Sequence, residues 1–153
     1  MHLEKTVHFS VSRDTLWGYV RDKTRFQTIG YVEQVHVERG DWPAEGTRGT
    51  IQVRLKEKKY HAPFTIERYK DASDLVARVT GGALEGAAFY FHAKDGPNGG
   101  SVLTGGFRLG GLLGFAARAS GLQERIASAV DRELLAFKDR VEKEAGQPTK
   151  PAP

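Results

Sequence analysis

One long apolar stripe near the C-terminal end constrains the fold of this 153-residue chain more than any other feature. Apolar side chains recur there every three or four residues, at Phe115, Ala119, Leu122, Ile126, Val130, Leu134, Phe137 and Val141. This spacing predicts one face of an α-helix, and a helix from Phe115 to Glu144 would be roughly 40 Å long. Because such a helix must bury its apolar face, the rest of the chain has to supply a matching apolar surface.

The preceding segments supply that surface as short strands. Apolar and polar residues alternate from Leu3 to Val11, which is the pattern of a half-buried strand. Ser12 and Asp22 then stand where they can cap two short helices. Alternating segments follow near residues 35–37, 51–55, 60–66, 75–79, 87–93 and 101–109, separated by short turns.

Short turns between neighbouring strands predict antiparallel pairing. The sequence therefore predicts an α+β fold, in which a curved antiparallel sheet of about seven strands wraps around a long C-terminal helix and two short helices follow the first strand. Residues 1–145 are expected to form a single domain, and residues 146–153 a disordered, Pro-rich tail.

Composition excludes several classes of protein. The chain has no cysteine, so a disulfide framework, a thiol nucleophile and a thiolate metal site are excluded. No apolar run approaches the roughly 20 residues of a membrane span, and the first residues lack the apolar core of a signal peptide. We therefore expect a soluble, cytoplasmic protein without stable membrane insertion.

The net charge of +4 is mildly basic, and the basic residues cluster only around one predicted hairpin, at Arg54, Lys56, Lys58 and Lys59. Lysines at such a place commonly protect a sheet edge from aggregation. No aromatic residues are interleaved with these charges to form a stacking platform, so a nucleic-acid partner is not expected. Recognition of a protein partner by this hairpin stays open as an alternative.

Catalytic and metal-binding patterns are absent from the sequence. The five histidines form no HExxH or HxH motif. Three of them, His36, His61 and His92, fall opposite the apolar residues of their strands and are expected to face solvent. Ser120 is not in a GxSxG turn, and the Gly105–Gly114 segment lacks the Lys-Ser/Thr pair of a phosphate loop. We expect no catalytic residue, no cofactor and no metal.

Three segments resemble a known group of proteins. They are FSVSRDTLWGYVRD (residues 9–22), EGTRG (residues 45–49) and GFRLGGLLGFAAR (residues 106–118). Together with the element order, they resemble the SRPBCC superfamily, most closely its polyketide cyclase/dehydrase and lipid-transport branch, which is related to START domains and pollen allergens. The motifs are Trp17 in the first helix, the Gly46-Thr47-x-Gly49 turn, and the glycines at 110, 111 and 114. Where many relatives have a tryptophan or a proline after the second helix, this chain has Ile29-Gly30-Tyr31.

The resemblance implies a cavity for an apolar ligand between the sheet and the long helix. Residues 1–145 would then be a helix-grip ligand-binding domain. Aromatic residues in phase with the aliphatic residues of the strands fit such a lining, with Tyr60 and Arg68 as a hydroxyl and a charge at the two ends of one wall. The alternative, which we favour for Arg68, is that its side chain reaches solvent past the end of the strand. The expected ligand-binding residues are Ile29, Tyr31, Tyr60, Phe64, Arg68, Phe89, Phe91, Phe107, Leu112, Phe115, Leu122 and Ile126. The expected mouth lies near Ile29, Tyr31, Leu112 and Phe115, and the 110–114 segment is expected to gate it.

One ambiguity affects this set. A slip of one residue in the 87–93 strand would exchange Phe89 and Phe91 for Tyr90 and His92, which would bring a titratable imidazole into the pocket. We favour a binding or carrier module for a hydrophobic or amphipathic small molecule such as a lipid, a polyketide or an aromatic metabolite. The alternatives are an enzyme of the polyketide cyclase/dehydrase type and a protein-interaction module. The oligomeric state stays open.

Overall fold

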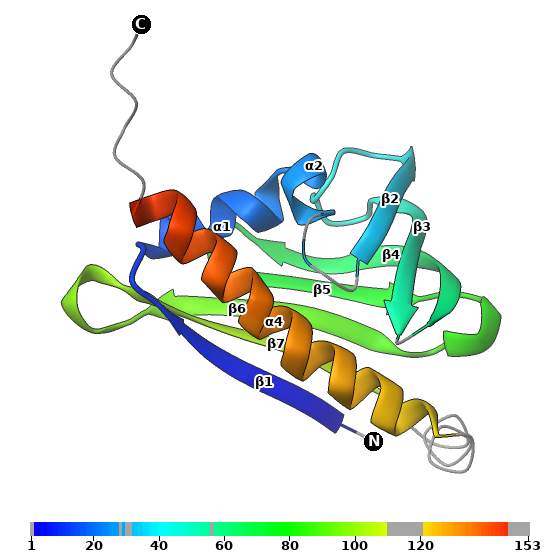
Figure 1. Ribbon diagram of the computed structural model, residues 1–153. Coiled ribbons are helices and arrows are strands. Elements are labelled where there is room, and N and C mark those ends of the chain that lie inside the picture. Colours follow the sequence, from blue (N-terminus) through cyan, green and yellow to red (C-terminus); the bar gives the residue numbers. More distant parts are fainter. Residues whose placement is uncertain (1, 28, 30–31, 56, 110–120, 147–153) are drawn as a thin grey trace, which may run out of the picture.

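The computed structural model describes residues 2–27, 29, 32–55, 57–109 and 121–146 (Figure 1). In chain order the elements are β1 (His2–Phe9), α1 (Arg13–Arg21), α2 (Lys23–Phe26), β2 (Val32–Arg39), β3 (Arg48–Leu55), β4 (Lys58–Lys70), β5 (Asp74–Val79), η1 (Gly82–Leu84), β6 (Ala88–Asp95), η2 (Pro97–Gly99), β7 (Ser101–Arg108) and α4 (Leu122–Gly146). The expected start of the long helix at Phe115 and most of the expected tail lie outside the described residues.

The strands form one antiparallel sheet of seven strands in the order β1-β7-β6-β5-β4-β3-β2. The α4 helix runs across one face of this sheet, and α1 and α2 lie at the end of the sheet where α4 finishes (Figure 1). We call the face under α4 the inner face and the opposite face the outer face. The predicted α+β helix-grip architecture is confirmed. No helix in the described part of the chain is long and apolar enough to cross a membrane.

The two short helices begin where the sequence predicts. The Ser12 side chain accepts a hydrogen bond from the Thr15 amide at 3.2 Å, which caps α1. The Asp22 carboxylate accepts hydrogen bonds from the amides of Thr24 and Arg25, which caps α2. Each cap satisfies amides that have no partner within the helix.

The apolar stripe of α4 is buried against the inner face. Its described members Ile126, Val130, Leu134, Phe137 and Val141 are all buried. The close approach depends on Gly105 of β7, where a Cβ atom would lie 3.1 Å from Leu134 Cδ1 and 3.3 Å from the ring of Phe91. A glycine at this place lets the helix and the sheet come together without a clash.

The C-terminal half of α4 is tied to the start of the chain. Glu142 accepts hydrogen bonds from the backbone amide and the hydroxyl of Ser10, and Tyr19 donates a hydrogen bond to Glu144. The Phe137 ring packs edge-on against Phe9 and Tyr19, with centroids 5.8 and 5.4 Å apart. These contacts join α4 to β1 and α1.

A β-bulge in β4 changes which side chains face the helix. Ile66 pairs with Ala77 and Arg68 pairs with Val76, so Glu67 is an extra residue in the strand. Both Glu67 and Arg68 are consequently exposed on the outer face, and Tyr69 turns inward. The Tyr69 hydroxyl there accepts a hydrogen bond from Trp17 Nε1 at 2.9 Å.

Candidate functional site

Most of the described residues expected to bind a ligand lie on the inner face. Tyr60, Phe64, Phe89, Phe91, Phe107 and Ile126 are buried there, and Ile29 after α2 is fully buried. The 87–93 strand adopts the register in which Phe89 and Phe91 point inward, while His92 is exposed on the outer face. Its imidazole is therefore not available to a ligand held under α4.

The placement of Arg68 on the inner face is wrong. The bulge at Glu67 shifts Arg68 to the outer face, where its side chain is 65% exposed and forms an ion pair with Asp74. Tyr31, Leu112, Phe115 and the expected gate at 110–114 lie outside the described residues. Leu122 is the first residue of α4, and its side chain also lies outside the description.

A hollow of about 660 Å³ lies between α4 and the β3–β4 turn. Its described lining consists of Glu57 and Lys58 from the turn and Arg125 and Arg132 from the helix. The two arginines are seven residues apart and therefore lie on one flank of α4, beside the buried stripe. Sequence reasoning did not select them, although their spacing along the predicted helix was a visible signal.

The described lining of this hollow carries three cationic groups and one carboxylate, Glu57. The Lys58 ammonium lies 5.4 Å from the ring centroid of Tyr60, which is buried on the inner face just inside the turn. Two other cations of the hairpin, Arg54 and Lys59, instead form ion pairs with Glu33 of β2. The basic hairpin therefore has part of its charge neutralised within the sheet, and Lys58 faces the hollow.

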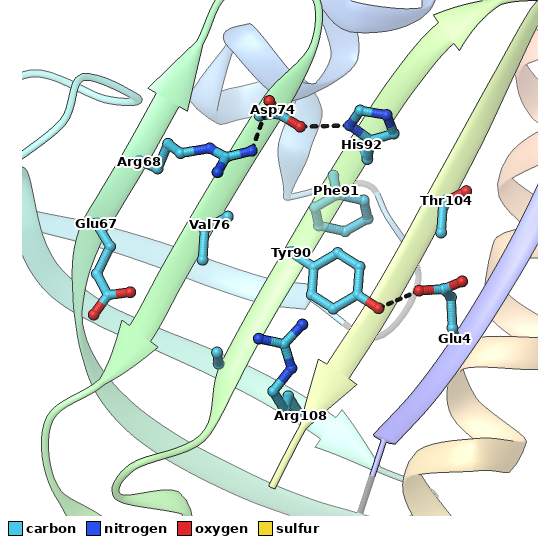
Figure 2. A pocket seen from close by; sticks show the side chains of 11 residues that line it. Glu4, Glu67, Arg68, Asp74, Val76, Tyr90, Phe91, His92, Thr104 and Arg108 are labelled. Carbon is cyan, nitrogen blue, oxygen red and sulfur yellow. Dashed lines mark hydrogen bonds and ion pairs between the residues drawn. The ribbon is translucent and has the colours of Figure 1, made fainter.

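The outer face carries a second hollow, of about 490 Å³, over β4, β5, β6, β7 and β1 (Figure 2). The Tyr90 hydroxyl donates a hydrogen bond to Glu4 and accepts one from His2. Burial and the hydrogen bond to Glu4 raise the pKa of Tyr90 above its usual range, so it stays protonated at neutral pH. Figure 2 shows the hydroxyl directed at Glu4, across β7.

Asp74 forms the opposite wall of this hollow. Its carboxylate accepts a hydrogen bond from Arg68 Nη2 at 3.0 Å and contacts His92 Nδ1 (Figure 2). Burial alone would raise the pKa of Asp74, but the hydrogen bonds from His92 and Arg68 hold it below its usual value of 3.8. Asp74 is therefore charged at neutral pH.

A metal centre has no support in the described ranges, where no group of three His, Asp or Glu side chains is placed to hold an ion. His36 and His61 line a small polar hollow on the outer face, together with Gln34, Thr50 and Gln52. All three strand histidines, His92 included, are exposed on the outer face. Their predicted solvent-facing position is confirmed.

Solved structures share this architecture. TTHA0849 from Thermus thermophilus superposes with a TM-score of 0.73 and 14% identity, covering 96% of this chain and 100% of that one. The Aha1 dimer from Colwellia psychrerythraea superposes with a TM-score of 0.68 and 10% identity, covering 93% of this chain and 96% of that one. A Polyketide_cyc-like protein, Cgl2372 from Corynebacterium glutamicum, superposes with a TM-score of 0.62 and 15% identity, covering 99% of this chain and 97% of that one.

No family model matches the chain, and no curated protein matches it. At these low identities the likeness to solved structures shows the fold. The chain shares its helix-grip fold with these solved structures, so the resemblance found in its sequence is confirmed at the level of the fold.

Proposed function

We propose that this protein is a binding or carrier module for a hydrophobic or amphipathic small molecule held between the inner face of the sheet and α4. The observation that carries the proposal is the hollow between the β3–β4 turn and α4, where the ammonium of the lining residue Lys58 lies 5.4 Å from the ring centroid of the buried Tyr60. Ligand sites in proteins are usually concave and mostly apolar, with a few polar groups that fix orientation. The charged residues of this hollow would supply the polar groups, and the buried inner face behind them would supply the apolar part.

The polar groups of the hollow suggest how an amphipathic ligand would be oriented. Lys58, Arg125 and Arg132 line it with positive charge, Arg132 being also paired with Glu133 at 3.3 Å. Tyr60 and Ile126 are buried on the inner face. The apolar part of the ligand would lie under α4, and its polar or acidic group would meet the arginines, which suit carboxylates. This role replaces the one expected for Arg68.

Two observations favour this proposal over an enzyme or a protein-interaction module. The titratable imidazole that a shifted β6 would bring inside, His92, lies on the outer face. Two of the hairpin cations that would contact a protein partner are paired with Glu33. A cytoplasmic location remains part of the proposal, and a chain without cysteine fits it.

Displacement of an uncharged fluorescent probe, Nile red, tests the proposal. We expect the wild-type protein to bind Nile red and both dodecanol and laurate to displace it. The double variant Arg125→Gln/Arg132→Gln should lower the affinity for laurate roughly tenfold, because charge-assisted hydrogen bonds are lost, and leave that for dodecanol unchanged. Lys143→Gln, a charge removed at the other end of α4, is the matched control.

Native mass spectrometry of protein purified from its own host gives an independent readout, since a carried molecule should co-purify. A folded wild-type protein that binds neither Nile red nor dodecanol, and carries no small molecule when purified, would overturn the proposal. Equal loss of laurate and dodecanol affinity in the double variant would overturn the role assigned to the two arginines, and would leave the proposed function standing.

A further inference from the structure

We propose that the outer-face hollow is a second binding site, for a small carboxylate that carries a flat apolar body, such as an aromatic acid. Its described lining belongs to β1 and to the four strands β4 to β7, and includes Glu4, Arg68, Val76, Tyr90 and Arg108 (Figure 2). The sheet separates this site from α4, so the proposal is independent of any ligand on the inner face.

The strand register builds the floor of the hollow. One row of paired residues crosses five strands: Arg68, Val76, Tyr90, Gly106 and Glu4. The row alternates long side chains with a short one or none, so it is low at Val76 and at Gly106, and the Tyr90 ring lies over Gly106. In the next row, Ala88 of β6 pairs with Arg108 of β7. The small side chains of Val76 and Ala88 thus form an apolar floor between longer ones.

Gly106 gives Tyr90 a fixed position in this floor. A Cβ atom at residue 106 would overlap the end of the Tyr90 ring and would lie 2.8 Å from the Leu3 carbonyl oxygen. Because glycine leaves this space empty, the ring extends over β7 and its hydroxyl reaches Glu4 on the next strand. The hydrogen bonds from Tyr90 to Glu4 and from His2 to Tyr90 hold the ring there as an apolar surface. A flat apolar ligand can pack on it.

Arg108 is the group in the hollow that is placed to bind an anion. Each of its three carboxylates has partners: Glu4 contacts Tyr90 and His2, Glu67 pairs with Arg78, and Asp74 pairs with Arg68 and His92. Among the described residues, the Arg108 guanidinium is paired with no carboxylate, and it lies 5.9 Å from the centroid of the Tyr90 ring. The hollow therefore offers, beside an apolar floor, an arginine without a carboxylate partner. Glu4, across the Tyr90 ring, is bonded to a neutral hydroxyl and to a histidine, so it stands at the far side of the floor from the anion site.

A guanidinium presents two parallel N–H groups that match the two oxygens of a carboxylate. A ligand with its carboxylate on Arg108 and its flat body on Tyr90, Val76 and Ala88 satisfies both the charge and the apolar floor. The volume of about 490 Å³ is enough for a ligand of one or two rings.

Two-dimensional NMR titration with 2-naphthoate, and with the uncharged 2-naphthamide, tests this site. We expect 2-naphthoate to shift the amide signals of β5, β6 and β7 and the imidazole signal of His92, and 2-naphthamide to bind at least fivefold more weakly. Arg108→Gln should lower the affinity for 2-naphthoate roughly tenfold, because a charge-assisted hydrogen bond is lost. Arg54→Gln, a comparably exposed outer-face arginine paired with Glu33, should leave the affinity unchanged.

A second variant tests the floor. Val76→Phe should fill part of the hollow and abolish the titration, and circular dichroism checks that the variant is folded. Saturating dodecanol should leave the 2-naphthoate shifts in place, because it is directed to the inner face. Unchanged affinity in Arg108→Gln, or shifts confined to α4 and the β3–β4 turn, would overturn the second site without affecting the proposed function.

Discussion

At the scale of single residues, the Asp74 carboxylate makes the free energy of unfolding depend on pH. Its side chain is only 15% exposed, and burial alone would raise its pKa, but the bonds from His92 and Arg68 lower it below 3.8. Because the pKa is lower in the folded than in the unfolded chain, the charged carboxylate stabilises the folded state above about pH 3.8. That contribution is lost as the pH falls through the folded pKa.

We therefore expect Asp74→Asn to lower the free energy of unfolding at pH 7, and expect the difference from wild type to shrink as the pH falls below about 3.8. Urea melts at a series of pH values measure this. Asp139→Asn, which removes an exposed carboxylate on α4, is the control for the loss of one surface charge. A deficit in Asp74→Asn that stays constant down to pH 2 would contradict the assignment.

At the scale of elements, α4 is held on the sheet by the face that carries its buried apolar residues. The neighbouring residues Leu134 and Leu135 are identical in chemistry, but Leu134 is fully buried and Leu135 is 45% exposed. Leu134 also contacts the surface left open by Gly105, where no side chain intervenes. The contribution of the buried face to the free energy of unfolding can thus be measured by comparing substitutions at these two adjacent leucines.

Leu134→Ala should destabilise the protein by about 2–5 kcal/mol, because it removes buried methyl groups and leaves a cavity over Gly105. Leu135→Ala should change the free energy of unfolding by less than about 0.5 kcal/mol, as surface substitutions usually do. Chemical denaturation of both variants measures the difference. Similar values for the two leucines would show that α4 does not pack on the sheet through this face.

The bulge in β4 leads to a prediction about deletions. Removing Glu67 would place Arg68 directly after Ile66 and restore regular alternation, with Arg68 still outside and Tyr69 still inside. Removing Thr65 would instead turn Ile66 outward and disturb the pairing with β3. We expect the Glu67 deletion to fold with a modest loss of stability and the Thr65 deletion to unfold, as followed by circular dichroism. Equal damage from both would contradict this account.

At the scale of the whole molecule, both halves of α4 contact β1, the first through the ion pair between Lys5 and Asp131, and the first half also borders the hollow. The second half is tied to β1 and α1 by the bonds from Ser10 to Glu142 and from Tyr19 to Glu144. The first half carries Arg125 and Arg132 along the hollow. A ligand at the inner face would therefore stabilise the first half more than the second.

We expect saturating dodecanol to slow amide hydrogen exchange in residues 124–134 and in the β3–β4 turn, with little change in residues 135–146. Mass spectrometry of peptides from these segments measures the difference, and the second half of the helix is the internal control. Uniform slowing along all of α4 would argue against a ligand at this end.

Local patterns predicted most of the fold and part of the candidate site. Alternation placed Phe64, Phe89 and Phe91 on the correct face, since period-two burial follows directly from strand geometry. The error at Arg68 has a physical cause: the bulge falls between two charged residues, and their order gives no local sign of which one is extra. The hollow beside Arg125 depends on how far α4 stands from the β3–β4 turn, which is a tertiary distance.

The pairing of β1 with β7 also bears on synthesis by the ribosome. His2 pairs with Arg108, a separation of 106 residues (108 − 2), and among the described strands β7 is the one that lies beside β1. At translation rates of roughly 5–20 residues per second, the N-terminal strand waits about 5–20 s for its partner to emerge. During that interval the charges of Glu4 and Lys5 oppose association with other nascent chains. The first strand made is thus among the last to be paired.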